Sequence, residues 1–207
     1  KHHKINMDLL ILDLNGVLVK EILAHELTKK YRPEGEKYWK QYKEGEISAT
    51  EIVKKVGKTL EDIEYSKFEE MADRISPVEN SKEFASEIKE KYKTAIISSD
   101  FDILPKKIAN ELGIKNYYGN VPIVENGEFK GRVKEPILAD EGKTRIAKDL
   151  KKEYDTERII TVGDDNTNID LFKNSDLTIG YNPFEELKKY SDVVINTENI
   201  LDVLEFL

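Results

Sequence analysis

Residues 9–18 read LLILDLNGVL, in which four consecutive aliphatic residues are followed at once by Asp13. A continuous apolar run, in place of an alternating one, is typical of a strand that is buried on both faces of a parallel sheet. The run therefore predicts a first strand over residues 9–12 that is buried on both faces and places Asp13 at its carboxyl end.

Later segments repeat this pattern, and helical patterns lie between them. Phe84, Ile88 and Tyr92 share one helical face, and Asn182-Pro183 before two glutamates predicts a helix start. Strands that alternate with helices predict a doubly wound, mostly parallel α/β sheet. The further predicted strands are Ala95–Ile97 before Ser98, Ile159–Val162 before Gly163, Leu177–Ile179 before Gly180, and Val193–Ile195 before Asn196.

Residues 20–77 interrupt the alternation because they contain no strand-like run. Helical spacing of apolar residues recurs there, and Ser48 with Glu51 forms a capping-box pattern. We interpret residues 20–77 as a helical cap domain inserted after the first strand, within an α/β core formed by 7–19 and 78–207.

Two shorter segments also stand apart from this pattern. Asn126-Gly127, between extended residues, predicts a β-hairpin. Residues 1–6, with His2 and His3, have the character of a tag remnant, and we exclude them from the fold and from the metal ligands.

Composition excludes several classes of function. The net charge of −8 argues against a nucleic-acid partner. The absence of cysteine excludes disulfides, thiolate metal sites and cysteine nucleophiles. We find no apolar run of membrane-spanning length and no signal-peptide pattern. A soluble cytoplasmic protein with no membrane partner is the expectation.

Polar residues at the strand ends locate the candidate site. In open α/β sheets, ligands bind beyond the carboxyl ends of the strands, which selects Asp13, Ser98 and Asp164. Carboxylates that meet there repel each other unless a cation lies between them, and oxygen ligands suit Mg²⁺. A single strand-end aspartate would be read as a turn residue, but three convergent strand ends favour a site.

Four segments occur in the order and spacing of a known set of motifs: DLNGVL at 13–18, Ile-Ser at 97–98, Lys143, and GDDNTN at 163–168. This set resembles the motifs of the haloacid dehalogenase superfamily, whose fold is a Rossmann-like core. Further segments are similar to its phosphoserine phosphatase-like branch, namely EGEI at 44–47, SSDFD at 98–102 and NGEFKG at 126–131.

The resemblance implies a phosphatase-like enzyme that acts on a small phosphorylated metabolite. Asp13 would be the nucleophile that forms an aspartyl phosphate. The implied Mg²⁺ ligands are Asp13, the backbone carbonyl of Asn15, Asp164 and Asp165, the last through a bound water or else as a solvated loop acid. The implied phosphoryl-binding residues are Ser98, Ser99 and Lys143.

Two asparagines depart from the family pattern. Asn15 stands where the family has an aspartate for acid–base catalysis, a contribution of roughly 10²–10⁴-fold. Asn168 replaces the usual final aspartate of the fourth motif. Three explanations stay open: a natural phosphatase for good leaving groups, a weakened or non-hydrolytic phospho-ligand binder, or an engineered Asn15. A phosphotransferase is a further alternative.

The predicted cap also departs from the phosphoserine phosphatase pattern. Ile22 and Val56 align with the acid and the arginine that hold the amino-acid part of the substrate, so phosphoserine is disfavoured. Asp100 replaces a glycine, and we expect it either to act as a substitute base or to repel anionic substrates. Tyr38, Trp39 and Tyr42 form an exposed-looking aromatic cluster, for which packing is preferred over substrate contact or a partner surface. The sequence leaves the oligomeric state open.

Overall fold

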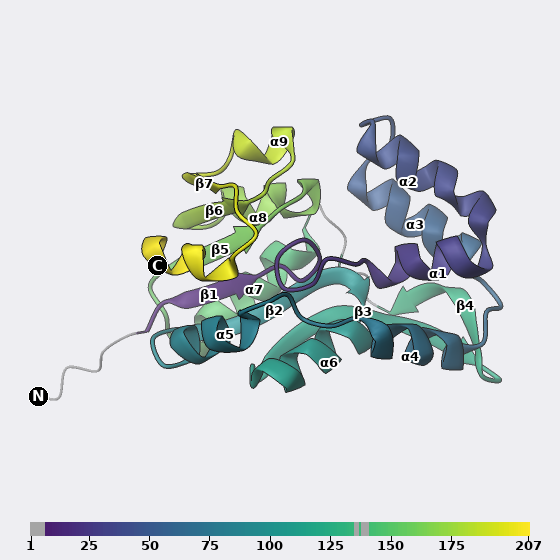
Figure 1. Cartoon of the computed structure of the whole chain (residues 1–207), viewed down its shortest axis with the longest axis horizontal. Helices are drawn as coiled ribbons and strands as arrows, with labels where there is room; N and C mark the ends of the chain where they lie inside the picture. Colours follow the sequence, from purple (N-terminus) through teal and green to yellow (C-terminus); the bar gives the residue numbers. More distant parts are fainter. Residues whose placement is uncertain (1–6, 135–136, 138–140) are drawn as a thin grey trace, which may run out of the picture.

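The computed structural model describes residues 7–134, 137 and 141–207, so the tag-like residues 1–6 lie outside it. The strands form one sheet in the order β4-β3-β2-β1-β5-β6-β7 (Figure 1). Their bounds are β1 Leu9–Leu12, β2 Lys93–Phe101, β3 Asn116–Glu125, β4 Glu128–Lys134, β5 Ile159–Gly163, β6 Leu177–Tyr181 and β7 Val193–Ile195.

Strand β1 lies at the centre of the sheet. It is buried on both faces, as its sequence predicts. It pairs in parallel with β2 and β5, so that Leu12 lies beside Ile96 and Val162. The backbone N–H of Asp13 donates to the Val162 carbonyl at 2.9 Å. This last bond fixes Asp13 at the carboxyl edge of the sheet.

Alternate residues of β1 belong to two apolar layers. Leu10 and Leu12 pack with α5, α6 and the final 3-10 helix η3, whereas Leu9 and Ile11 pack with α7 and α8. Helices on both faces of a mostly parallel sheet confirm the predicted doubly wound fold. These elements are α5 Ser81–Lys89, α6 Ile103–Leu112, α7 Gly142–Tyr154, η2 Asn166–Asn168, α8 Ile169–Lys173, α9 Glu185–Lys188 and η3 Ile200–Phe206.

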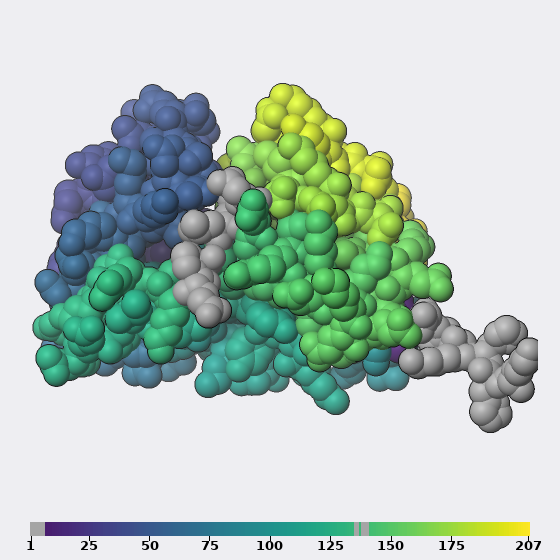
Figure 2. All heavy atoms as spheres, turned by 180° about the vertical axis from the view of Figure 1, so that it is seen from behind, coloured from purple at the N-terminus to yellow at the C-terminus, as the bar shows by residue number. Residues whose placement is uncertain are grey.

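Residues 20–77 are helical where they are regular, and they include α1 Leu23–Tyr31, η1 Pro33–Gly35, α2 Glu36–Lys43, α3 Ala49–Thr59 and α4 Tyr65–Arg74. The capping box at α3 is confirmed, because the Ser48 hydroxyl accepts from the Glu51 N–H and the Glu51 carboxylate accepts from the Ser48 N–H. In Figure 2 these helices and the C-terminal segment rise on opposite sides of a notch. The domain boundaries themselves stay a prediction.

The predicted hairpin is β3–β4. Asn126 and Gly127 have φ of 52° and 81°, and this left-handed backbone is what a two-residue hairpin turn requires. The hairpin extends below α1 and α3 (Figure 1), and its Phe129 exchanges backbone hydrogen bonds with Asp62 and Ile63. The core sheet therefore also supports the inserted helices.

Three local predictions were wrong. Strand β2 continues through Ser98 to Phe101, because Phe101 still lies opposite Asn120 of β3 after a register shift. Strand β7 is an edge strand with Val194 40% exposed, and it is not buried on both faces. Asn182 does not start α9, since its amide pairs with the backbone of Thr197 instead.

An aromatic cluster joins the inserted helices to the sheet, with ring centroids of Phe68, Phe101 and Phe129 5.0–5.4 Å apart. Phe68→Ala should lower the free energy of unfolding by about 3–5 kcal/mol, because it opens a cavity among fully buried rings. Phe206→Ala is the control, since Phe206 is 43% exposed, and it should change stability by less than about 0.5 kcal/mol. Urea denaturation measures both, and equal losses would contradict a role for the cluster.

Candidate active site

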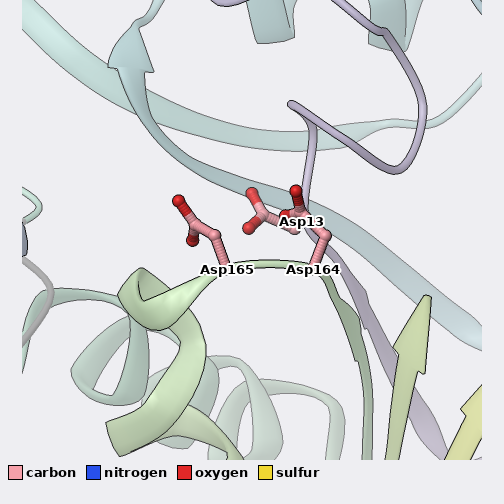
Figure 3. Close-up of side chains that lie close together, drawn as sticks. All are labelled: Asp13, Asp164 and Asp165. Carbon is pink, nitrogen blue, oxygen red and sulfur yellow. The ribbon is translucent and has the colours of Figure 1, made fainter. Parts of the chain in front are cut away.

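Three carboxylates meet at the carboxyl edge of the sheet. Asp13 follows β1, and Asp164 and Asp165 follow β5 (Figure 3). One oxygen atom from each lies within 4.8 Å of the others. Gly16, with φ of +76°, lets Asp164 approach, since a Cβ at this position would lie 1.8 Å from Asp164 Oδ2.

The acidic cluster is electrostatically strained. Burial, and then the charges of Asp165 and Asp13, raise the pKa of Asp164 well above its ordinary value. Burial and the charge of Asp13 also raise the pKa of Asp165. Asp164 Oδ1 is buried and accepts no hydrogen bond from the residues that the structure describes. An all-oxygen cluster with an unsatisfied buried oxygen fits a Mg²⁺ ion.

Lys143, in the first turn of α7, is the counter-charge beside this cluster. Its ammonium is 1% exposed and donates to Asp13 Oδ2 at 2.9 Å, to Asn168 Oδ1 at 2.9 Å and to Thr167 Oγ1 at 3.1 Å. The Asn168 amide N–H also donates to Asp13 Oδ2. Asn168 thus orients both Lys143 and Asp13, without adding the negative charge that an aspartate would bring.

Ser98 and Ser99 are adjacent but differ in their surroundings. The Ser98 hydroxyl is fully buried, donates to Asn15 Oδ1 at 3.1 Å and accepts from the Asp100 N–H at 3.0 Å. Ser99 lines the cavity beside Asp13, and its buried hydroxyl has no hydrogen-bond partner among the described residues. Phosphoryl binding by either serine stays a prediction.

Both the oxygen and the nitrogen of the Asn15 side-chain amide form hydrogen bonds. Its Oδ1 accepts from Ser98, and its Nδ2 donates to the Glu21 carbonyl at 2.8 Å and to Asp100 Oδ2 at 3.2 Å. An ionised aspartate could make neither of the two donations. The amide thus ties the turn after β1 to the segment that enters α1.

Asp100 anchors the start of α1, whose N-cap residue Ile22 provides no capping side chain. The Asp100 carboxylate accepts from the N–H groups of Leu23 at 2.6 Å, Ala24 at 3.2 Å and Phe101 at 2.9 Å, as well as from Asn15. Burial raises the pKa of Asp100, but its backbone donors favour the anion. These bonds occupy both oxygens and disfavour a role as substitute base.

For Tyr42 and Trp39 the sequence favoured packing over substrate contact, and it did not predict that both lie at the candidate site. The prediction that both side chains are exposed is wrong, because each is buried and only 8% exposed. The Tyr42 hydroxyl donates to Asp165 Oδ2 at 3.0 Å, and burial raises the Tyr42 pKa. Trp39 lines the cavity beside Asp13. The feature of the sequence that could have indicated their burial is the spacing of three between the two aromatic residues in a lysine-rich helix.

The fold and this edge of the sheet define the class of protein. The family model of the haloacid dehalogenase-like hydrolases matches residues 7–176, so the chain belongs to this family. Within that class it is similar to phosphoserine phosphatases. The resemblance inferred from the motifs is therefore confirmed.

The similarity covers nearly the whole chain. The phosphoserine phosphatase of Methanocaldococcus jannaschii is 28% identical over 204 residues, which are 96% of this chain and 97% of that protein. A structure described as a phospho-aspartyl intermediate analogue of phosphoserine phosphatase aligns with a TM-score of 0.90 at 26% identity, covering 98% and 99% of the two chains. A substrate-bound phosphoserine phosphatase complex also aligns at 0.90 and 26% identity, covering 97% and 98%.

No helix in the described part of the chain combines the length and the apolarity that crossing a membrane requires.

Mg²⁺ should stabilise the protein by neutralising the acidic cluster. The pKa of Asp164 is higher in the folded protein than in the unfolded chain. Ionised Asp164 therefore lowers the free energy of unfolding at neutral pH. This destabilisation decreases as the pH falls from the folded-state pKa toward the ordinary value. At about 100 times its Kd, Mg²⁺ should add roughly 2.7 kcal/mol, which raises Tm by about 5–11 °C.

Asp164→Asn should raise Tm in the presence of a chelator and remove most of the Mg²⁺ effect. Asp73→Asn, at an exposed position on α4, is the control and should keep the effect. Differential scanning calorimetry measures both. A full Mg²⁺ response in the Asp164 variant would place the ion elsewhere.

Asn15→Asp should lower the free energy of unfolding at neutral pH by about 1–3 kcal/mol, because it removes two donations and sets two carboxylates side by side. The loss should shrink in an Asp100→Asn background, with a coupling of about 0.5–3 kcal/mol in a double-mutant cycle. Asn196→Asp, at an exposed position, is the control. Additive effects in chemical denaturation would show that residues 15 and 100 act independently.

Proposed function

We propose that the chain is a Mg²⁺-dependent phosphomonoester hydrolase for a small phosphorylated compound, with Asp13 as its nucleophile. The position of Asp13 carries this proposal. Its Oδ1 accepts from the Leu14 N–H at 2.7 Å, its Oδ2 is held by Lys143 and Asn168, and its side chain borders the cavity. The similarity to a structure described as a phospho-aspartyl intermediate analogue supports the same role.

The reaction proceeds as two displacements at phosphorus. A carboxylate oxygen of Asp13 forms a bond to phosphorus as the ester P–O bond breaks, and the leaving oxygen takes up a proton. Water then attacks the aspartyl phosphate, which releases phosphate and restores the carboxylate. Lys143, which contacts Asp13, and the unpaired Ser99 hydroxyl would stabilise the phosphoryl oxygens, together with the neighbouring Ser98.

The residues that would hold Mg²⁺ are Asp13, the Asn15 backbone carbonyl, Asp164 and Asp165. The ion, when bound, neutralises charge between the nucleophile and the phosphoryl group. Tyr42 donates to the Asp165 carboxylate, and we propose that it orients this ligand. The family membership supports the assignment, as does the unsatisfied oxygen of Asp164.

Proton supply sets the preferred leaving group. Asn15 has no acidic proton to give, and both oxygens of Asp100 accept backbone or amide donors. We therefore expect the fastest turnover with phenolic esters and acyl phosphates, whose leaving oxygens need least protonation.

A non-hydrolytic phospho-ligand binder is the second candidate. It is favoured by one observation, the use of Asn15 as a structural link between Ser98 and the entry to α1. Retained binding of inorganic phosphate without multiple turnover would support it. Acceptor-dependent release would instead indicate a phosphotransferase.

The purified chain should release phosphate from para-nitrophenyl phosphate only with Mg²⁺, and Asp13→Asn should abolish this release. Lys143→Met should lower kcat/KM by about 10²–10³-fold, because it removes the buried cation beside the phosphoryl group. Lys152→Met is the control, since Lys152 is exposed on the same helix. Steady-state kinetics measures all of these. Full activity in the Asp13 variant would refute the assignment of the nucleophile.

A further inference from the structure

The cavity beside Asp13 has a volume of about 330 Å³ and an apolar interior. One wall comes from the helices α2 and α3, which lie over the β3–β4 hairpin in Figure 1. The opposite wall comes from β2 and the hairpin. The apolar side chains that define the two walls are Trp39, Ile52 and Val56 on one side, and Phe101, Phe129 and Val133 on the other.

Two polar side chains that line this cavity, Asn120 and Asp100, are already paired within the protein. The Asn120 amide donates to the Ser99 carbonyl at 2.7 Å and accepts from the Ile137 N–H at 2.7 Å. The Asp100 carboxylate is fully engaged by its N–H donors. A substrate ammonium or carboxylate placed there would lose its hydration without a partner, which is costly.

The basic residues that line the cavity do not change this conclusion. Lys54 and Arg132 are both solvent-exposed. A charge paired with either of them would stay in contact with water. Discrimination by the buried walls therefore rests on apolar contact.

We propose that the site selects phosphate monoesters whose leaving group is apolar and uncharged, in place of a phosphorylated amino acid. This inference rests on the proposed function, because it takes Asp13 and its neighbours as the phosphoryl end of the cavity. The leaving group then lies between Trp39 and Phe129, and each added methylene that becomes buried should raise affinity about fourfold.

Phosphonates that resist hydrolysis test the preference separately from turnover. With Mg²⁺ present, isothermal titration calorimetry compares 3-phenylpropylphosphonate with L-2-amino-4-phosphonobutyrate, which carries an ammonium and a carboxylate. The apolar phosphonate should bind at least about 10-fold tighter. A series from methyl- to pentylphosphonate should show rising affinity. Equal or tighter binding of the amino-acid phosphonate, or a flat alkyl series, would overturn the proposal.

A charged wall should weaken or reverse the preference. Val56→Arg places a cation in the apolar wall, and it should lower the ratio of the two affinities at least about 10-fold. Val194→Arg adds the same charge on the exposed edge strand β7 and should leave the ratio unchanged. An unchanged ratio in the Val56 variant would also overturn the proposal.

The proposed hydrolysis and the proposed substrate class can be refuted independently of each other. Phosphate release from acetyl phosphate, whose leaving group is small, reports on the phosphoryl end alone. Release from acetyl phosphate without any preference among the phosphonates would refute the substrate class and leave the proposed hydrolysis standing. Tight binding of the apolar phosphonate without hydrolysis of any ester or acyl phosphate would refute the hydrolysis and leave the binding preference standing.

Discussion

The burial of like charges at the end of β1 is the constraint on which the rest of this structure depends. Three carboxylates converge there and only one of the described lysines, Lys143, contacts them as a buried ion-pair partner. The parallel pairing of β1 with β5 places these acids together, and the first turn of α7 delivers the ammonium. The fold thus maintains an excess of negative charge that favours a divalent cation.

A second set of contacts connects this charged edge to the inserted helices. Asn15 and Asp100 form one hydrogen-bonded unit that holds the chain as it enters α1. Tyr42 reaches back from α2 to the acidic cluster. The position of the helices is therefore linked to the residues expected to carry out the chemistry, and the asparagine at position 15 has a structural purpose whatever its effect on the rate.

The sequence predicts the fold and the charged edge well because both depend on local patterns. An apolar run followed by a polar residue places Asp13 and Asp164, and an Asn-Gly pair places the hairpin turn. The contacts of Tyr42 and Asp100 were not predictable in this way. Tyr42 and Asp165 are 123 positions apart, and Asp100 and Leu23 are 77 apart, so only the folded chain shows that they meet. The length of β2 likewise depends on its partner strand.

The backbone bonds between the hairpin and the inserted segment bear on how a ligand could enter. The N–H of Asp62 donates to the Phe129 carbonyl, the N–H of Phe129 donates to the Ile63 carbonyl, and the N–H of Tyr65 donates to the Gly127 carbonyl. If the inserted helices moved away without the hairpin, all three of these hydrogen bonds would break. Any movement of the inserted helices as one unit would therefore carry the tip of the β3–β4 hairpin with it.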